Sequence, residues 1–142
     1  MRADPVFDRI VIYHNDPESE EYSAVDAEYV SEVPTIDFFD KNEKNLLVFE
    51  DINLKYMKRD QIALIDRYYG CWSTHHNISV LSTFQDPFGC PARVRQLANI
   101  VILWNNGDAD SMSELSRKVG LTSKDLRYIF DHMQDYGKTC LR

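Results

Sequence analysis

The sequence predicts an α/β fold, a mainly parallel β-sheet with flanking helices. Short apolar runs rich in isoleucine and valine recur along the chain at strand length. Segments whose apolar residues follow helical spacing lie between these runs and after them. The run Leu46–Phe49 is continuously apolar, which is typical of a strand covered on both faces of a parallel sheet. Because a parallel strand pair needs a long crossover, the alternation of strands with helices favours parallel pairing.

Length and composition predict one soluble globular domain over residues 1–142, since 44% of the residues are hydrophobic and 27% are charged. The charge is uneven: residues 1–51 carry 14 acidic and 4 basic side chains, and residues 52–142 carry 9 and 12. The acidic first third is therefore unsuited to nucleic acid, and the remainder is only mildly basic. Three widely spaced cysteines without a CxxC pair favour a reducing, intracellular setting. No apolar run is long enough for a signal peptide or a membrane span, so no membrane partner is expected.

The first half of the chain is predicted to contain two strands, two short helices and one amphipathic helix. Strands are indicated by β-branched content, and the amphipathic helix by apolar residues that return to one face. The acidic stretch 16–32 is predicted to be largely a surface loop. The strands span 7–13 and 46–49, the short helices lie around Ser23–Val30 and after Thr35 as a cap, and the amphipathic helix spans 60–69 with Asp60 as its N-cap.

The second half is predicted to contain two more strands and three more helices. The predicted strands span 78–84 and 99–104, a short helix lies at 91–97, and two helices span 111–119 and 122–136 about a turn at Gly120-Leu121.

Polar side chains directly follow each predicted strand. The carboxyl ends of parallel strands meet along one edge of a sheet, and ligands bind at that edge in open α/β folds. The residues expected there are Asn15 with Asp16, Glu50 with Asp51, Gln85 with Asp86, and Asn105 with Asn106.

The segment Leu46–Asp51, four apolar residues followed by two acids, has the form of a Walker B element. In that element a buried strand aims one carboxylate at Mg²⁺ or its water shell, and the next carboxylate polarises the attacking water. Glu50 is thus the candidate metal ligand, and Asp51 is the candidate activator of water. The alternative is an acidic strand end that simply faces solvent, because the pattern is short.

A glutamine at the tip of the next strand is suited to sensing a nucleotide. The amide of Gln85 has the groups to hydrogen-bond both an attacking water and a γ-phosphate. The alternative is that Gln85 caps a loop. His75 and His76 precede this strand without any further cysteine or histidine at ligand spacing, so a zinc site is not predicted.

The order of these motifs resembles the viral genome-packaging ATPases of large DNA viruses, the poxvirus-type branch of the FtsK–HerA superfamily. The succession runs from Glu50-Asp51 through a helix, His-His-Asn-Ile-Ser-Val at 75–80, Gln85, two arginines and a strand ending at Asn105. Residues 7–15 and 19–22 resemble the segment that follows the P-loop helix in that family, so the likeness covers most of 7–140. The resemblance implies a partial RecA-like P-loop NTPase core.

The resemblance further implies an ATP-driven motor that translocates and packages double-stranded DNA. Glu50 is implied as the ligand of Mg²⁺, Asp51 as the activator of water for ATP hydrolysis, and Gln85 as the sensor. Arg93 or Arg95 is implied to reach the γ-phosphate held by a neighbouring subunit, the alternative being a solvated helix face. The expected partners are copies in a ring or an intact ATPase subunit. The expected location is the host cytoplasm, a virus factory or the virion.

The sequence departs from that family in two respects. The order Glu50-Asp51 differs from the commoner Asp-first form of the Walker B element, and the sequence contains no G-x-x-x-x-G-K-[ST] motif. The only Gly-Lys-Thr, at 137–139, has no preceding glycine at the required spacing and no strand before it. Without a P-loop no backbone amides cradle the phosphates, so this chain by itself is expected not to hydrolyse ATP. We therefore expect a fragment or split product of an intact ATPase, or a silent regulatory subunit that assembles with one.

A helical hairpin is predicted at 111–136, and residues 112–134 match the spacing of a helix-turn-helix. Ser116 lies four residues before the turn glycine, and Thr122 with Asp125 predicts a capping box for the second helix. This pattern supports an alternative function as a non-enzymatic, DNA-associated protein. The second helix mixes basic with acidic side chains, however, which favours a plain hairpin that covers the sheet.

Overall fold

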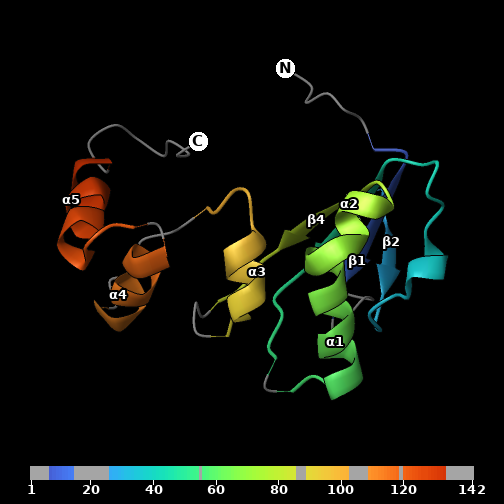
Figure 1. Cartoon of the computed structure of the whole chain (residues 1–142), viewed down its shortest axis with the longest axis horizontal. Helices are drawn as coiled ribbons and strands as arrows, with labels where there is room; N and C mark the ends of the chain where they lie inside the picture. The colour runs from blue at the N-terminus through green and yellow to red at the C-terminus, as the bar shows by residue number, and fades with distance from the viewer. Residues whose placement is uncertain are drawn as a thin grey trace. The chain divides into compact units, whose positions relative to one another are not determined.

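The computed structural model describes residues 7–14, 26–54, 56–85, 89–102, 109–118 and 120–133. The chain divides into two compact units, Met1–Gln85 and Asp86–Arg142, whose elements are labelled in Figure 1. Within the described ranges, none of the helices has both the length and the apolar character that crossing a membrane requires.

In the described part of the first unit, four strands form a sheet in which every pair is parallel (Figure 1). This sheet confirms the predicted α/β class with parallel pairing. The strand order is β2-β1-β3-β4, so β1 and β3 are the inner strands. The strands are β1 at Arg9–Tyr13, β2 at Glu28–Val30, β3 at Asn45–Phe49 and β4 at Ile78–Ser82.

A long helical segment packs on one face of this sheet (Figure 1). It runs through α1, Arg59–Arg67, a π-helical stretch η3, Tyr68–Trp72, and α2, Ser73–His75. Amphipathic spacing brings Ile65 into the core, where it is fully buried. On the inner strand β3, Leu47 and Phe49 are fully buried as well, so this layer forms the hydrophobic core of the unit.

Tyr68 fixes the helical segment to the loop before η2, a short 3₁₀ helix at Ile36–Phe38. Its side chain is fully buried, and its ring meets those of Phe39 and Phe49 edge-on. Its hydroxyl donates a hydrogen bond to the Pro34 carbonyl oxygen at 2.9 Å. Burial raises the pKa of this phenol, because the phenolate would lose its hydration inside the core.

The opposite face of the sheet is less covered than the sequence predicts. Leu46 and Val48 on β3 are half-buried, and Leu81 on β4 is 49% exposed. The expectation that β3 is covered on both faces is therefore wrong. A continuous apolar run shows only that both faces of a strand suit burial, and burial also needs an element packed on each side.

Two local predictions in this unit are also wrong. Residues 28–30 form the edge strand β2 instead of part of a helix around Ser23–Val30, because parallel pairing with β1 satisfies their backbone groups. The amphipathic helix begins at Arg59 with Lys58 as its N-cap, which places Asp60 in the first turn. A carboxylate there still stabilises the helix through its dipole, so Asp60 marks the helix start without capping it. Thr35 does precede η2, but without a side-chain cap hydrogen bond.

The second unit contains α3 at Ala92–Leu97, α4 at Ala109–Lys118 and α5 at Ser123–Met133. These helices confirm the predicted helices at 91–97, 111–119 and 122–136. Met112 and Ser116 of α4 and Leu126 of α5 are buried, so the two helices form the predicted hairpin around a small core.

The turn of the hairpin is built by two capping structures. Gly120 has a φ of 72°, a left-handed conformation that glycine adopts without strain, and the Leu121 amide donates to the Ser116 carbonyl oxygen at 2.9 Å. At the start of α5 the Asp125 amide donates to Thr122 Oγ1 at 3.2 Å, and the Thr122 amide donates to Asp125 Oδ2 at 3.1 Å. The predicted capping box is therefore confirmed.

The prediction of a strand at 99–104 is wrong for residues 99–102, the part of this range that the structure describes. Residues 99–102 form no strand, and Ile100, Val101 and Ile102 are 75%, 47% and 51% exposed. β-branched side chains favour an extended backbone locally, but a strand forms only where a neighbour satisfies its backbone groups. No such neighbour lies along this segment in the described part of the chain.

Candidate functional site

The acidic pair Glu50 and Asp51 lies at the carboxyl end of the inner strand β3. The Glu50 amide donates to the Tyr13 carbonyl oxygen at 3.1 Å, which extends the ladder between β1 and β3 by one residue. Both acids are half-buried. The continuous apolar run therefore ends where the sequence predicts, and its two carboxylates follow directly at the edge where parallel sheets bind ligands.

Asp51 has a backbone conformation that is unusual for a residue other than glycine. Its φ is 46°, in the left-handed region that costs an ordinary side chain free energy and that aspartate tolerates better than most. Its amide donates to Thr83 Oγ1 at 2.8 Å, and the Thr83 amide donates to the Phe49 carbonyl oxygen at 2.9 Å. The segment after β4 thus holds the turn after β3 in place, and strain held by neighbouring contacts is typical of functional positions.

Gln85 lies beside Asp51, although β3 and β4 are separated by the whole helical segment in sequence. Gln85 Nε2 donates to Asp51 Oδ2 at 2.8 Å. Hydrogen bonds to an ionised carboxylate are stronger than neutral ones, and this one orients both side chains. β4 itself ends at Ser82, two residues earlier than predicted, so Gln85 reaches Asp51 from a short loop.

Sequence reasoning missed two residues of this site. Thr83 holds the Asp51 amide, and its one signal in the sequence is a hydroxyl residue directly after a strand. His14 is the first residue after β1, and its amide donates to the Val30 carbonyl oxygen at 3.1 Å. Since Tyr13 pairs with Phe49, His14 takes the register position next to Glu50. The sequence pattern around His14 indicates only a turn, although its place after an inner strand matches that of Glu50.

The remaining predicted members of the sheet edge fall outside the described residues. These are Asn15, Asp16, Asp86, Asn105 and Asn106. The described site therefore consists of two acids, one amide side chain, one hydroxyl and one imidazole.

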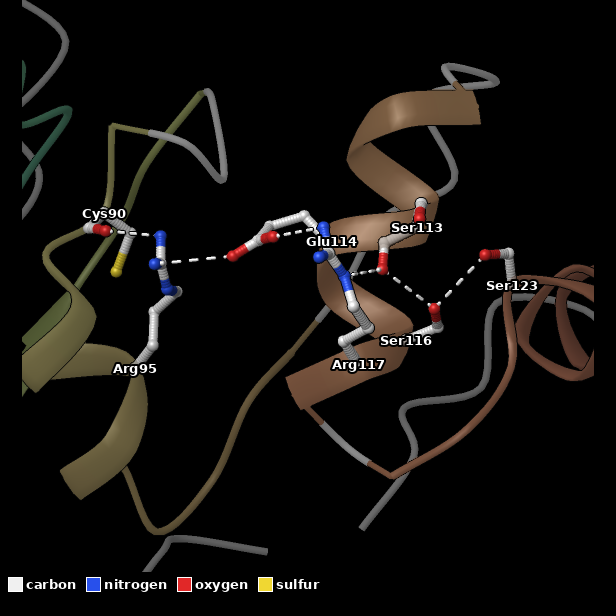
Figure 2. A network of polar contacts seen from close by, with 7 residues as sticks. All are labelled: Cys90, Arg95, Ser113, Glu114, Ser116, Arg117 and Ser123. Atoms are coloured by element: carbon white, nitrogen blue, oxygen red, sulfur yellow. Dashed lines mark hydrogen bonds and ion pairs between the residues drawn. The ribbon is translucent and has the colours of Figure 1, made fainter.

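Arg93 and Arg95 lie on α3 in the second unit, where their environments differ. Arg95 Nη1 donates to the Cys90 carbonyl oxygen at 2.7 Å, and its Nη2 lies 3.4 Å from Glu114 Oε1 on α4 (Figure 2). Glu114 also pairs with Arg117 through its other oxygen at 2.8 Å. Arg95 thus links α3 to α4, whereas the Arg93 side chain is exposed. Of the two arginines, Arg93 is the one accessible to an external phosphate.

Within the described residues, no three acidic, histidine or cysteine side chains gather as a metal-binding group. His75 ends α2, and His76 follows it in a turn. Two adjacent carboxylates do suit Mg²⁺, which is usually held by one or two carboxylates together with water and phosphate oxygens.

The fold and this edge define a parallel α/β protein with a carboxylate–amide pair at the carboxyl ends of two adjacent strands. No known protein family, characterised protein or solved structure was found to match the chain. A carboxylate fixed by an amide is able to accept a proton from water, orient a water molecule, or bind a hydrated cation.

Proposed function

We propose that this chain supplies the acidic and sensing part of the nucleotide site of an ATP-driven motor that translocates and packages viral DNA. The observation that carries the proposal is the 2.8 Å hydrogen bond from Gln85 to Asp51 across two adjacent parallel strands. An acid and an amide at this edge are what a nucleotide hydrolase needs to orient a water and to respond to a phosphate. A strand end that only faces solvent gives no physical reason for the strained, left-handed backbone of Asp51, so this backbone favours a functional role for the residue.

Each residue has a distinct role in this proposal. Glu50 is the residue that would hold Mg²⁺, through its carboxylate, and the ion would supply positive charge against the phosphate oxygens. Asp51 orients the water and accepts its proton, and Gln85 keeps the Asp51 carboxylate in position. The sensing function in this proposal comes from the second N–H of the Gln85 side-chain amide, which donates to a phosphate oxygen while the first N–H stays on Asp51.

The phosphate cradle lies outside residues 1–142 in this proposal. The sequence contains no glycine-rich P-loop, so the backbone amides and lysine that surround the phosphates come from elsewhere in an intact ATPase or from a neighbouring subunit of a ring. We therefore expect the chain alone to bind a metal–nucleotide complex weakly and not to hydrolyse it. Arg93, exposed on α3, is the candidate residue for a neighbouring subunit's phosphate.

The experiment is a titration of the full chain with Mn²⁺ and ATP, followed by backbone amide NMR. Mn²⁺ occupies the same oxygen sites as Mg²⁺ and broadens nearby amide signals. We expect broadening centred on residues 50, 51 and 83–85, and about tenfold weaker binding in Gln85→Leu, because partners that orient a ligand typically contribute that much. Asp60→Asn is the matched control, since it removes one exposed carboxylate from α1.

Two results contradict the proposal. One is the absence of selective broadening at this edge at millimolar Mn²⁺ and ATP. The other is an equal loss of binding in Asp60→Asn and Asp51→Asn. That result would show that binding depends only on the net charge of the chain and not on the position of Asp51.

A second candidate function rests on the α4–α5 hairpin, a DNA-associated protein without enzymatic activity. The confirmed capping box and the exposed Lys124, Arg127 and Tyr128 on α5 support it, and the exposed Asp125 and Asp131 oppose it. Duplex binding is expected to weaken with salt, and Lys124→Gln with Arg127→Gln is expected to lower the log–log salt slope by about 0.9 for each phosphate that is no longer neutralised. A lack of duplex binding near physiological salt contradicts this candidate.

A further inference from the structure

β4 is the last strand of the sheet, and within the described residues no strand pairs with its outer edge. The Asn45 amide donates to the Asn77 carbonyl oxygen at 3.1 Å, and the Thr83 amide donates to the Phe49 carbonyl oxygen at 2.9 Å. Because backbone groups alternate sides along a strand, these bonds place the odd-numbered residues of 77–83 toward β3. Three residues therefore direct their backbone groups to the outer edge, where no other described residue bonds these groups: Ile78, Val80 and Ser82.

Nothing in β4 protects this edge against a further strand. Natural edge strands carry charged side chains, proline or a bulge, which prevent pairing with another chain. β4 has the sequence Ile-Ser-Val-Leu-Ser, without charge or proline, and its five residues pair with β3 in an uninterrupted register. Its Leu81 side chain is apolar and 49% exposed. This edge is therefore suited to an uncharged, apolar strand.

The second unit contains an apolar segment of the kind that such an edge accepts. Ile100, Val101 and Ile102 are consecutive β-branched residues, which favour an extended backbone, and they are 75%, 47% and 51% exposed. Leu97, at the end of α3, is 45% exposed as well. No strand pairs with 99–102 in the part of the chain that the structure describes. A run of large apolar side chains in contact with water indicates an interaction surface.

The outer edge of β4 and the segment 99–102 are complementary in chemistry. Neither contains a charged side chain, although the whole chain has a net charge of −7. A contact through these two surfaces therefore brings no like charges of the surfaces together, whereas the acidic first third of one copy repels that of another. Each copy supplies one open edge and one exposed segment, so a second copy offers the partner that each surface lacks.

We propose that residues 99–102 of one copy add as a strand to the outer edge of β4 of a second copy. Strand addition of this kind derives affinity from main-chain hydrogen bonds, here to Ile78 and Val80, and specificity from alternate side chains. Because the two surfaces differ, the contact is heterologous, and successive copies form a ring where the rotation closes. A ring is the assembly that the proposed motor needs, but this contact does not depend on the nucleotide site.

The test is sedimentation velocity of the full chain across a concentration series, with the mass expected to rise above that of the monomer. Val101→Pro removes one amide donor and leaves its acceptor on β4 unsatisfied, so association should weaken by at least about fivefold. Leu81→Lys should weaken association as well, because it places a charge on the strand edge. Tyr128→Lys is the matched control, since it replaces a 61% exposed side chain on α5 with the same charge and should change nothing.

A mixture of two variants separates this contact from other modes of association. Leu81→Lys retains an intact segment 99–102, and Val101→Pro retains an intact β4 edge. One contact of wild-type strength is therefore expected between them, and it stops at a one-to-one dimer. Circular dichroism verifies that each variant is folded. Val80→Pro is the second edge variant, because the Val80 amide faces outward and its loss breaks no hydrogen bond to β3.

Three results would overturn the proposal. One is a wild-type chain that stays monomeric over the whole series. Another is association that the edge variants weaken and Val101→Pro does not, which indicates pairing of β4 with β4. The third is a mixture of Leu81→Lys and Val101→Pro that associates no better than either variant alone.

Discussion

Tyr68→Phe isolates the contribution of one buried hydroxyl to the stability of the first unit. The substitution keeps the ring, and with it the edge-on contacts to Phe39, Phe49 and Trp72 at centroid distances of 6.0, 5.8 and 5.0 Å. It removes the donor that lies 2.9 Å from the Pro34 carbonyl oxygen in a buried position. Leaving a buried acceptor without its donor costs about 1–3 kcal/mol. We expect the free energy of unfolding to fall by that amount.

The assay is urea unfolding followed by Trp72 fluorescence. The sequence has two tryptophans, so Trp104→Phe is introduced into every variant to leave Trp72 as the single reporter. Tyr128→Phe is the control, because that tyrosine is 61% exposed and loses only a solvated hydroxyl. An unchanged midpoint and slope in Tyr68→Phe would show that the hydroxyl does not hold the loop and would refute the reasoning.

The same substitution has a consequence at alkaline pH. Burial raises the pKa of the Tyr68 phenol, so the unfolded chain ionises at a lower pH than the folded one. The corresponding stabilisation is complete below about pH 10, the ordinary tyrosine pKa, and is lost as pH rises through the raised value. Tyr68→Phe should remove this part of the alkaline destabilisation. A remainder is expected from Tyr13, whose pKa is also raised by burial.

Two further predictions concern the hairpin of the second unit. Gly120→Ala should lower its stability by about 1–2 kcal/mol, because the φ of 72° strains any side chain even though no described residue beyond its chain neighbours lies within 4 Å of the added carbon. Helix content on thermal unfolding measures this loss, and no change would contradict the strain argument. Hydrogen bonds from the Thr122 hydroxyl and amide lower the pKa of Asp125, so the capping box should stabilise α5 above about pH 4 and lose this effect as pH falls through the lowered value. Thr122→Ala should return the pKa of Asp125 toward its ordinary value in a carboxyl-carbon NMR titration, and an unchanged pKa would show that Thr122 is not the cause.

The proposed site shows where sequence reasoning succeeds and where it stops. Glu50, Asp51 and Gln85 follow from a one-dimensional rule, since polar residues that directly follow apolar runs lie at the end of strands. In a parallel sheet the carboxyl ends of the strands meet at one edge. The hydrogen bond between Gln85 and Asp51 agrees with this expectation. It contains no information on the left-handed backbone of Asp51 or the support from Thr83, because both depend on contacts between segments 32 residues apart.

The arginines illustrate the opposite case. Arg93 and Arg95 are equivalent in sequence, two guanidinium groups on one short helix. Only packing distinguishes them, because Glu114 comes from a helix that follows much later in the chain and engages Arg95. A pattern of residue types does not reveal which charges are already paired.

By itself, the sequence determined the α/β class, the existence of the strands β1 and β3, the amphipathic helix α1 and the α4–α5 hairpin with its capping box. These features depend on local periodicity and on hydrogen bonds between near neighbours, which residue order encodes directly. Tertiary structure alone decided that 28–30 is a strand and that 99–102 is not, because a strand exists only when a distant segment satisfies its backbone groups. The same reason applies to the segment that follows β2, where the Pro34 and Phe38 carbonyl oxygens accept hydrogen bonds from Tyr68 and Arg9 of other elements.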